Sequence, residues 1–491
     1  MTGTDHPCLL PGGATTTNSS AYQGTISTLG PAGYVAWESQ GANWPNINGN
    51  YLKDHSVGSG PYYVTFASPS TGYSLKANPA YAAPTYCTWQ PGCQPAPGHY
   101  AGNVVVTYEL TDTPGIAAYA AGQVDFAFIL PPEIPSMLAL VHAGKIAAVT
   151  APTLSIYFDP INLEINLATY HSEFNAPLNI PSDFFDHVGL RQALVRAWPY
   201  QTSQNEILTV DGVQHAIPYG GPIPQFMANY YPDNISFPAT DPDYNPADVG
   251  SAGWWWQQAN TPSSPYYDPE LAACTPSNPC QFPVIGQDGL SFLDQMHQLY
   301  IANIAQLTGG AIKPSTFDIP FNQLIADQLT PGQTGMPFYN LAWSPDYPDP
   351  VDYVPTLVGT DNVYCGPDAC DEALNTSAYT NPACKPANDL GYWSSVGGMG
   401  AIPDNCQGNA WEAMQIMIGI AAPLPATPQR VLWYNMIDNI AYGLALYVYW
   451  QQEQIVPTCA SWIDPSTINT NVTIGGGFDN LWYSIGGNGV Y

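Results

Sequence analysis

The sequence predicts a mixed α/β protein of more than one domain, on three observations. The chain has 491 residues, which is ample for two or three domains. Hydrophobic residues make up 45% and aromatic residues 13%, enough to build real cores. Segments with strand-like alternation are followed by segments with helical periodicity. Strands that alternate with helices over such a length are typical of α/β or α+β proteins.

The first part of the chain predicts loops and then strands. Residues 1–50 are rich in Gly, Thr, Ser and Asn, show little periodicity and predict loops. Residues 55–81 predict a Gly-rich turn followed by two strands, because Tyr62–Phe66 alternates and Ser68–Gly72 has turn residues. Asn103–Leu110 predicts a third strand.

Helices and a buried strand are predicted further along. Thr113–Ala121 predicts a short helix, and the apolar run Val124–Leu130 predicts a buried strand. Ser182–Trp198 and Ser291–Leu307 keep apolar residues at helical spacing, so each predicts a helix that faces a core. Val431–Trp450 is the most hydrophobic segment, but polar residues and a glycine interrupt it. It predicts a core helix and not a membrane span.

The charge of the chain excludes nucleic acid as a partner. Five Lys and three Arg face 38 acidic residues, and the net charge at pH 7 is −30. No basic patch can neutralise phosphates, and anionic membranes are repelled. In strong acid, where carboxylates are protonated, the 8 basic residues and 8 His leave a charge of +16. This composition indicates an acidic exterior, in which Tyr, Asn, Gln and protonated acids replace ion pairs.

Ten cysteines indicate an oxidising compartment. Several of them lie in close pairs around short loops that contain proline, and such spacings predict disulfides. The predicted disulfides are Cys87 with Cys93, Cys274 with Cys280, Cys365 with Cys370, and Cys384 with Cys406. Cys8 and Cys459 have no assigned partner. Zinc binding is the alternative, but a structural zinc site favours shorter gaps without prolines.

Other features agree with an exported protein at the cell surface. Glycosylation sequons of the form Asn-x-Ser/Thr occur at Asn18, Asn234, Asn375 and Asn471. The N-terminal residues have neither a basic region nor a long apolar region, so no secretory signal is predicted. We therefore expect a processed or missing N-terminus.

The stretch AWSPDYPDPVDY (342–353) combines acids, prolines and aromatic rings. Its prolines disfavour helix at the residues before them, so Asp346, Asp349 and Asp352 are predicted to lie on a turning loop. A loop whose shape proline fixes can hold a carboxylate in place to bind a ligand. The alternative is a surface loop in which Asp-Pro pairs only form turns.

Five segments, taken in order, resemble one family. They are SVGSGPY (56–62), YAAGQVDFAF (119–128), FDHVGLRQALVRAW (185–198), GPIPQFM (221–227) and LAWSPDYPDPVDY (341–353). In sequence and spacing they resemble the oligopeptide- and dipeptide-binding class of extracellular solute-binding proteins, which serve ABC importers. The resemblance implies a periplasmic-binding-protein-like fold of two lobes joined by a hinge, which close over an extended ligand.

The same resemblance implies an organisation along the chain. Fewer residues precede SVGSGPY than in the family, so we expect a first lobe that is N-terminally incomplete, processed or completed by another chain. The expected parts are the first-lobe remainder (1–150), the second ligand-binding lobe (151–430) with disulfide-stapled insertions (250–285 and 361–410), and a C-terminal helix that returns to the first lobe with a Gly/Tyr-rich tail (431–491).

The resemblance also implies a ligand site. In this family the acid three residues after the Trp of a W-x-x-D loop can bind the α-ammonium of the ligand. The matching residues here are Trp343 and Asp346. Asp346 is therefore the expected ligand anchor, and Trp343 and Tyr347 are expected to line its pocket. Asp349 and Asp352 are expected to form turns.

The leading hypothesis is a non-enzymatic solute-binding protein at the cell surface, which captures peptides or oligosaccharides for an ABC importer. The expected partners are the ligand, the membrane subunits of the importer, and a second chain or further copies of this chain. No catalytic residue, metal site or cofactor is predicted, and HExxH, Walker, GxSxG and CxxCH motifs do not occur. A structural or filament-forming surface protein that reuses this fold is the alternative, and a secreted hydrolase is the third.

Overall fold

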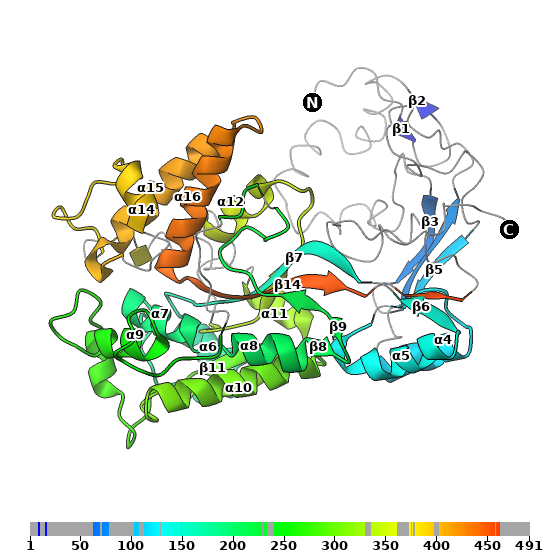
Figure 1. The fold of residues 1–491 in the computed structure, drawn as a ribbon, viewed down its shortest axis with the longest axis horizontal. Helices are drawn as coiled ribbons and strands as arrows, with labels where there is room; N and C mark the ends of the chain where they lie inside the picture. Colours follow the sequence, from blue (N-terminus) through cyan, green and yellow to red (C-terminus); the bar gives the residue numbers. More distant parts are fainter. Residues whose placement is uncertain are drawn as a thin grey trace, which may run out of the picture. The chain divides into compact units, whose positions relative to one another are not determined.

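The computed structural model shows a mixed α/β protein, as predicted (Figure 1). It describes residues 8–9, 15–16, 62–68, 71–77, 103–107, 112–127, 129–148, 150–227, 229–232, 240–328, 335–360, 373–374, 376, 379–396, 402–456 and 458–461. The chain divides into two compact units, residues 1–111 with 482–491 (unit 1) and residues 112–481 (unit 2). The lobe boundaries expected from the resemblance stay a prediction.

Unit 1 contains an antiparallel sheet of three strands. Its order is β3 (Tyr62–Ser68), β4 (Gly72–Ala77) and β5 (Asn103–Thr107). A short antiparallel pair is formed by β1 (Cys8–Leu9) and β2 (Thr15–Thr16). The three predicted strands are confirmed, the third over Asn103–Thr107, and the rest of the predicted third strand lies outside the described residues.

Unit 2 is built around an antiparallel sheet of four strands. The order is β10 (Ala216–Ile217), β14 (Tyr447–Ile455), β7 (Ala151–Pro160) and β13 (Leu341–Trp343). The two long strands, β7 and β14, pair along most of their length. β13 is the edge strand beside β7, and its last residue, Trp343, pairs with Ile156, so the loop that follows β13 begins at the edge of the sheet, level with the middle of β7.

The other strands of unit 2 form two-stranded sheets. β11 (Pro283–Gln287) and β12 (Ser315–Ile319) are parallel, and α10 (Ser291–Leu307) supplies the crossover that parallel pairing requires. The antiparallel pairs are β8 (Thr209–Val210) with β9 (Val213–Gln214), and β6 (Ile146–Ala148) with β15 (Thr458–Ala460).

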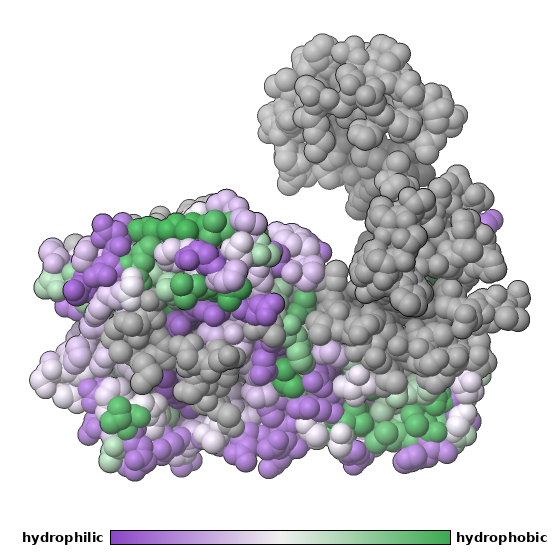
Figure 2. Space-filling model, turned by 45° about the horizontal axis from the view of Figure 1, so that its top comes forward, coloured by the Kyte–Doolittle hydropathy of each residue, from purple (hydrophilic) through white to green (hydrophobic). Residues whose placement is uncertain are grey.

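Helices lie on both sides of the central sheet, with α14, α15 and α16 on one side and α7 to α10 on the other (Figure 1). The bounds are α4 (Asp112–Ala120), α5 (Ile134–His142), α6 (Leu167–Glu173), α7 (Val188–Arg196), α8 (Tyr200–Thr202), α9 (Ala252–Ala259), α11 (Phe321–Gln328), α12 (Val354–Val358), α14 (Leu390–Val396), α15 (Gln407–Ala421) and α16 (Pro428–Leu444). Figure 2 shows apolar side chains among polar ones on the α14–α16 layer, where Leu432 is 46% exposed. Within the described residues, no helix has the length and apolarity needed to span a membrane.

The main core of unit 2 is rich in tryptophan. Its largest buried side chains include Trp198, Trp255, Trp393, Trp411 and Trp450. The rings of Trp198 and Trp450 stack with their centroids 5.5 Å apart, which joins the segment just after α7 to β14 of the central sheet. In the Trp254–Trp256 triplet, Trp255 is buried and its two neighbours pack against the same core. A smaller core lies between α4, α5 and β6.

The structure contains two of the predicted disulfides, Cys274 with Cys280 and Cys384 with Cys406. Each of the two expected insertions therefore carries a disulfide. The other predicted pairs, Cys87 with Cys93 and Cys365 with Cys370, lie outside the described residues, as do Asn18, Asn234, Asn375 and Asn471.

Three element predictions need correction. Val124–Leu130 is not a strand in its described part; it runs irregularly into a 3₁₀ turn at Pro131–Glu133, because an apolar run alone does not specify extended pairing. The helix expected from Ser182 begins only at Val188. The helix expected over Val431–Trp450 ends at Leu444, and a strand begins at Tyr447 after Ala445 adopts a left-handed conformation.

Candidate functional site

The loop that follows β13 carries the expected ligand anchor. Residues 344–349 form neither helix nor strand, as their prolines predict. A 3₁₀ turn, Pro350–Asp352, ends the loop and leads into α12. Asp346 and Tyr347 are exposed, Tyr347 at 45%, so both side chains are accessible to solvent.

Asp352 holds this loop from inside the protein. Its Oδ2 accepts a hydrogen bond from the backbone N–H of Asp346 at 2.7 Å. Burial raises the pKa of Asp352, although the hydrogen bond from Asp346 acts in the opposite direction. Asp352 therefore stabilises the turn, the role expected from the sequence.

Asp349 fastens the loop to α16. Its Oδ1 accepts a hydrogen bond from the N–H of Val351 at 2.9 Å and so caps the 3₁₀ turn. Its two oxygens also bind the guanidinium of Arg430, with distances of 2.8 and 2.5 Å. Burial raises the pKa of Asp349, but the hydrogen bonds and charge of Arg430 outweigh burial and hold that pKa below its usual value. The sequence predicted the turn but missed the ion pair.

Of the three residues expected at the ligand site, Trp343 ends β13, whereas Asp346 and Tyr347 lie on the loop that follows it. Trp343 pairs with Ile156 of β7 and packs, half-buried, against the main core. Asp346 and Tyr347 are exposed. The roles of Asp346 as anchor, and of Trp343 and Tyr347 as pocket lining, stay predictions.

A strip of polar side chains lies beside this loop, and sequence reasoning missed it. The polar strip consists of Thr153, Ser155, Tyr157, Ser344 and Glu453. The hydroxyls of Ser155 and Ser344 are 2.7 Å apart, and Tyr157 and Thr153 each donate to Glu453 at 3.3 Å. Burial raises the pKa of Glu453, although the hydrogen bonds lower it. The alternation of polar and apolar residues in TLSIYFD (153–159) is the signal that marks such a face.

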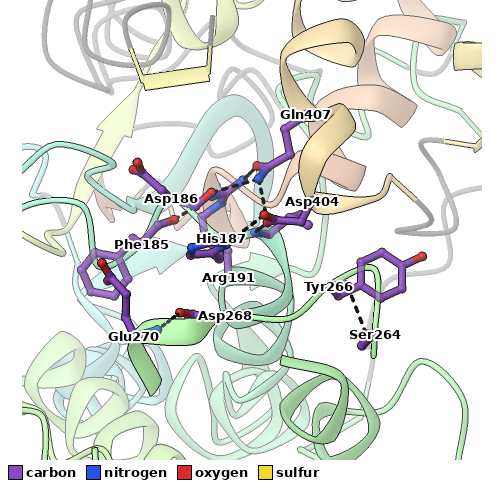
Figure 3. A network of polar contacts seen from close by, with 11 residues as sticks. Phe185, Asp186, His187, Arg191, Ser264, Tyr266, Asp268, Glu270, Asp404 and Gln407 are labelled. Carbon is purple, nitrogen blue, oxygen red and sulfur yellow. Dashed lines mark hydrogen bonds and ion pairs between the residues drawn. The ribbon is translucent and has the colours of Figure 1, made fainter. Parts of the chain in front are cut away.

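A second polar cluster, the acidic network, surrounds the start of α7 (Figure 3). It consists of Asp183, Asp186, His187, Arg191, Asp268, Glu270, Asp404 and Gln407. Asp404 lies 2.8 Å from Nδ1 of His187 and accepts the N–H of Val188 at 2.9 Å. The buried Arg191 donates to the backbone oxygens of Phe185, Asp186 and Leu444 and to the side chain of Gln407.

Burial in the acidic network favours the protonated form of its carboxyl groups. Burial raises the pKa of Asp186 and of Glu270 to about 7 and that of Asp268 to about 6. For His187, burial lowers the pKa, but Asp404 outweighs burial and raises it. In the part of the chain that the structure describes, no group of three His, Cys, Asp or Glu residues is placed to hold a metal ion.

Comparison with known sequences places most of the chain in one family. The sequence model described as "Bacterial extracellular solute-binding proteins, family 5 Middle" matches residues 21–365. No curated protein sequence matches the chain.

Solved structures share the fold. CtaP, an ABC transporter substrate-binding protein of Listeria monocytogenes, superposes with a TM-score of 0.56 at 12% identity, over 91% of this chain and 69% of that one. DppA of Helicobacter pylori in complex with the peptide STSA gives 0.55 at 14% identity, over 92% and 66%. AppA of Bacillus subtilis in complex with a nonapeptide gives 0.55 at 14% identity, over 85% and 66%. The chain thus spans about two thirds of the length of these three proteins.

Proposed function

Because the chain belongs to family 5 of the bacterial extracellular solute-binding proteins, we propose that it captures peptides outside the cell for an ABC importer. The peptides bound by DppA and AppA, proteins of the same fold, support peptide as the ligand class. The proposed partners are the membrane subunits of the importer, and the proposed location is the cell surface. A sugar ligand, self-assembly, a filament-forming role and hydrolase activity stay predictions from sequence.

One observation carries the peptide proposal, namely an exposed carboxylate on a loop of fixed shape. Asp346 is exposed, while its backbone N–H is held by the Asp352 carboxylate at 2.7 Å. A group that is already in place loses little freedom when it binds, and its charge strengthens a hydrogen bond to an ammonium group. Asp346 is therefore suited to bind the free amino end of a peptide, with the ring of Tyr347 beside it.

The first prediction tests this role of Asp346. A peptide library with free amino ends is screened by calorimetric titration, and the tightest-binding peptide is compared with its N-acetylated form. Asp346→Asn is expected to weaken binding of the free peptide by about one to three decades, because the proposed closure over the ligand desolvates the pair and the substitution leaves the ammonium group unmatched. Acetylation removes the ammonium, so the acetylated peptide is expected to bind weakly and equally to both proteins.

The matched control is Asp211→Asn, which removes another exposed carboxylate of unit 2. It is expected to leave both affinities unchanged. Equal affinity of wild type and Asp346→Asn for the free peptide would overturn the anchor role. If an oligosaccharide binds while no peptide does, the solute-binding function stands and the ligand class is wrong.

A further inference from the structure

We propose that Arg430 and Asp349 form a positioning pair, which holds the loop of Asp346 in its ligand-binding shape and ties that loop to α16. The inference rests on the proposed function, because it assigns the pair an effect on the affinity for the free amino end of a peptide. Neither residue is proposed to touch the ligand.

The pair itself is a two-point contact between a buried Arg430 and a partly exposed Asp349. Nη1 of Arg430 lies 2.8 Å from Oδ2 of Asp349, and Nη2 lies 2.5 Å from Oδ1. Arg430 is only 4% exposed. Two parallel bonds fix both the distance and the angle between the planar groups, which a single contact cannot do. The position of Asp349 is therefore set by α16.

Aromatic residues hold the guanidinium of Arg430 in place. Its Nη1 also donates to the hydroxyl of Tyr230 at 3.0 Å. Its Cζ lies 5.5 Å from the ring centre of Tyr230 and 5.1 Å from that of Tyr434. Cation–π contacts of this kind strengthen when water is excluded. These contacts hold the guanidinium of Arg430 in a single orientation toward Asp349.

A short chain of contacts leads from this pair to Asp346. Asp349 accepts the N–H of Val351 at 2.9 Å and so caps the 3₁₀ turn. That turn contains Asp352, whose Oδ2 accepts the N–H of Asp346 at 2.7 Å. The loop therefore leaves β13 and is closed on itself by Asp352, while Asp349 holds its far end. A shift of Asp349 moves the turn, and the turn carries the group that holds Asp346.

The position of Arg430 in the fold lets the pair connect two segments of unit 2. Arg430 lies in the first turn of α16, and α16 leads through Ala445 into β14 of the central sheet. The loop follows β13, which lies on the other side of β7 from β14. The pair therefore connects two segments that approach the central sheet from different strands. Arg430 is one of only three Arg residues in a chain with 38 acidic residues.

The test separates positioning from a merely structural role. Arg430→Lys keeps the charge but loses the two-point geometry, and Asp349→Asn keeps one acceptor for the N–H of Val351. Each variant is expected to bind the free-amino peptide about tenfold more weakly and its N-acetylated form as wild type does. In the Asp346→Asn background, neither substitution is expected to weaken the peptide further, because the group that it positions is absent.

Asp389→Asn is the matched control, since it breaks the exposed ion pair of Asp389 with Lys385, in which the charged atoms are 3.7 Å apart. It is expected to leave both affinities unchanged. If Arg430→Lys does not fold, the affinities of Asp349→Asn alone test the positioning role. A lowered melting temperature with unchanged affinity would overturn the positioning role, and so would an equal loss for both peptides or a further loss in the Asp346→Asn background. If Asp346→Asn itself has no effect, the proposed anchor fails, and the positioning role fails with it.

Discussion

Gly221 shows how a single residue fixes the contact between a loop and α16. Its φ is +84°, and a Cβ atom there would lie 2.4 Å from Oδ1 of Asp438. Asp438 is fully buried and accepts the N–H of Ile223 at 3.2 Å, and burial raises its pKa well above the usual value. The absence of a side chain at Gly221 therefore lets the GPIPQFM segment (221–227) pack directly on a buried carboxylic acid.

Replacement of Gly221 tests this close contact. Gly221→Ala is expected to lower the free energy of unfolding by about 3 kcal/mol or more, because backbone strain and a clash with a buried group add together. Gly212→Ala is the control, since its φ is +83° but no atom lies within 4 Å of the added Cβ. The control is expected to cost about 1 kcal/mol from the left-handed backbone conformation alone. Equal losses in urea unfolding would show that the clash with Asp438 relaxes without cost.

At the level of elements, local signals predicted some helices in full and others only in part. α10 was predicted over its whole length, Ser291–Leu307, because its apolar periodicity is complete within the segment. α7 was predicted to begin at Ser182 but begins at Val188. The N–H of Val188 is capped by Asp404, 216 residues further along the chain, and no local pattern reveals such a partner.

For the candidate site, too, the sequence predicted local features but not contacts between distant segments. The prolines of residues 342–353 predicted a turning loop, and the W-x-x-D pattern of the family that the chain resembles pointed to Asp346. The partner of Asp349 was not predictable, because Arg430 is 81 residues away and lies on a helix. The polar strip was missed because hydroxyl residues in a strand also occur on ordinary half-buried faces, and the pairing with Glu453 depends on the fold.

The two disulfides are expected to stabilise their elements unequally. Cys274 and Cys280 are 6 residues apart, whereas Cys384 and Cys406 are 22 apart. In the loop-entropy model a longer loop loses more freedom in the unfolded chain. Removal by paired Cys→Ser changes is expected to cost about 2 kcal/mol for Cys274 with Cys280 and about 3 kcal/mol for Cys384 with Cys406. Urea unfolding without reductant measures both, and a larger loss for the shorter loop would contradict this account.

At the scale of the whole molecule, the acidic network joins segments that are far apart in sequence. Asp268 and Glu270 come from one disulfide-bearing insertion, and Asp404 from the other. Both meet the start of α7, and Arg191 links α7 to the end of α16 at Leu444. The groups that face one another there are Asp183, Asp186, His187, Arg191, Asp268, Glu270, Tyr379 and Asp404. Among these groups, the buried Arg191 is the basic residue that stays charged over the whole acidic and neutral pH range.

The direction of the pH dependence follows from these pKa shifts. A carboxylic acid whose pKa is higher in the folded state stabilises the fold fully at pH values below its unfolded pKa of about 4. That stability is lost as the pH rises through the folded values, about 6 for Asp268 and about 7 for Asp186 and Glu270. His187, whose pKa is also raised, acts in the same direction. Asp349, whose pKa is lowered, opposes them only in stronger acid.

We therefore expect the melting temperature to fall as the pH rises from about 4 to about 7, since a shift of two pKa units at Asp268 alone corresponds to about 3 kcal/mol. Glu270→Gln removes one titrating group and keeps a hydrogen-bonding side chain, so it is expected to flatten this fall. Glu164→Gln, at an exposed position outside the network, is expected to leave the pH profile unchanged. Scanning calorimetry at constant ionic strength measures all three proteins. A melting temperature that is highest near pH 7, or equal profiles for wild type and Glu270→Gln, would show that ionised carboxylates do not destabilise the junction of the two insertions with α7.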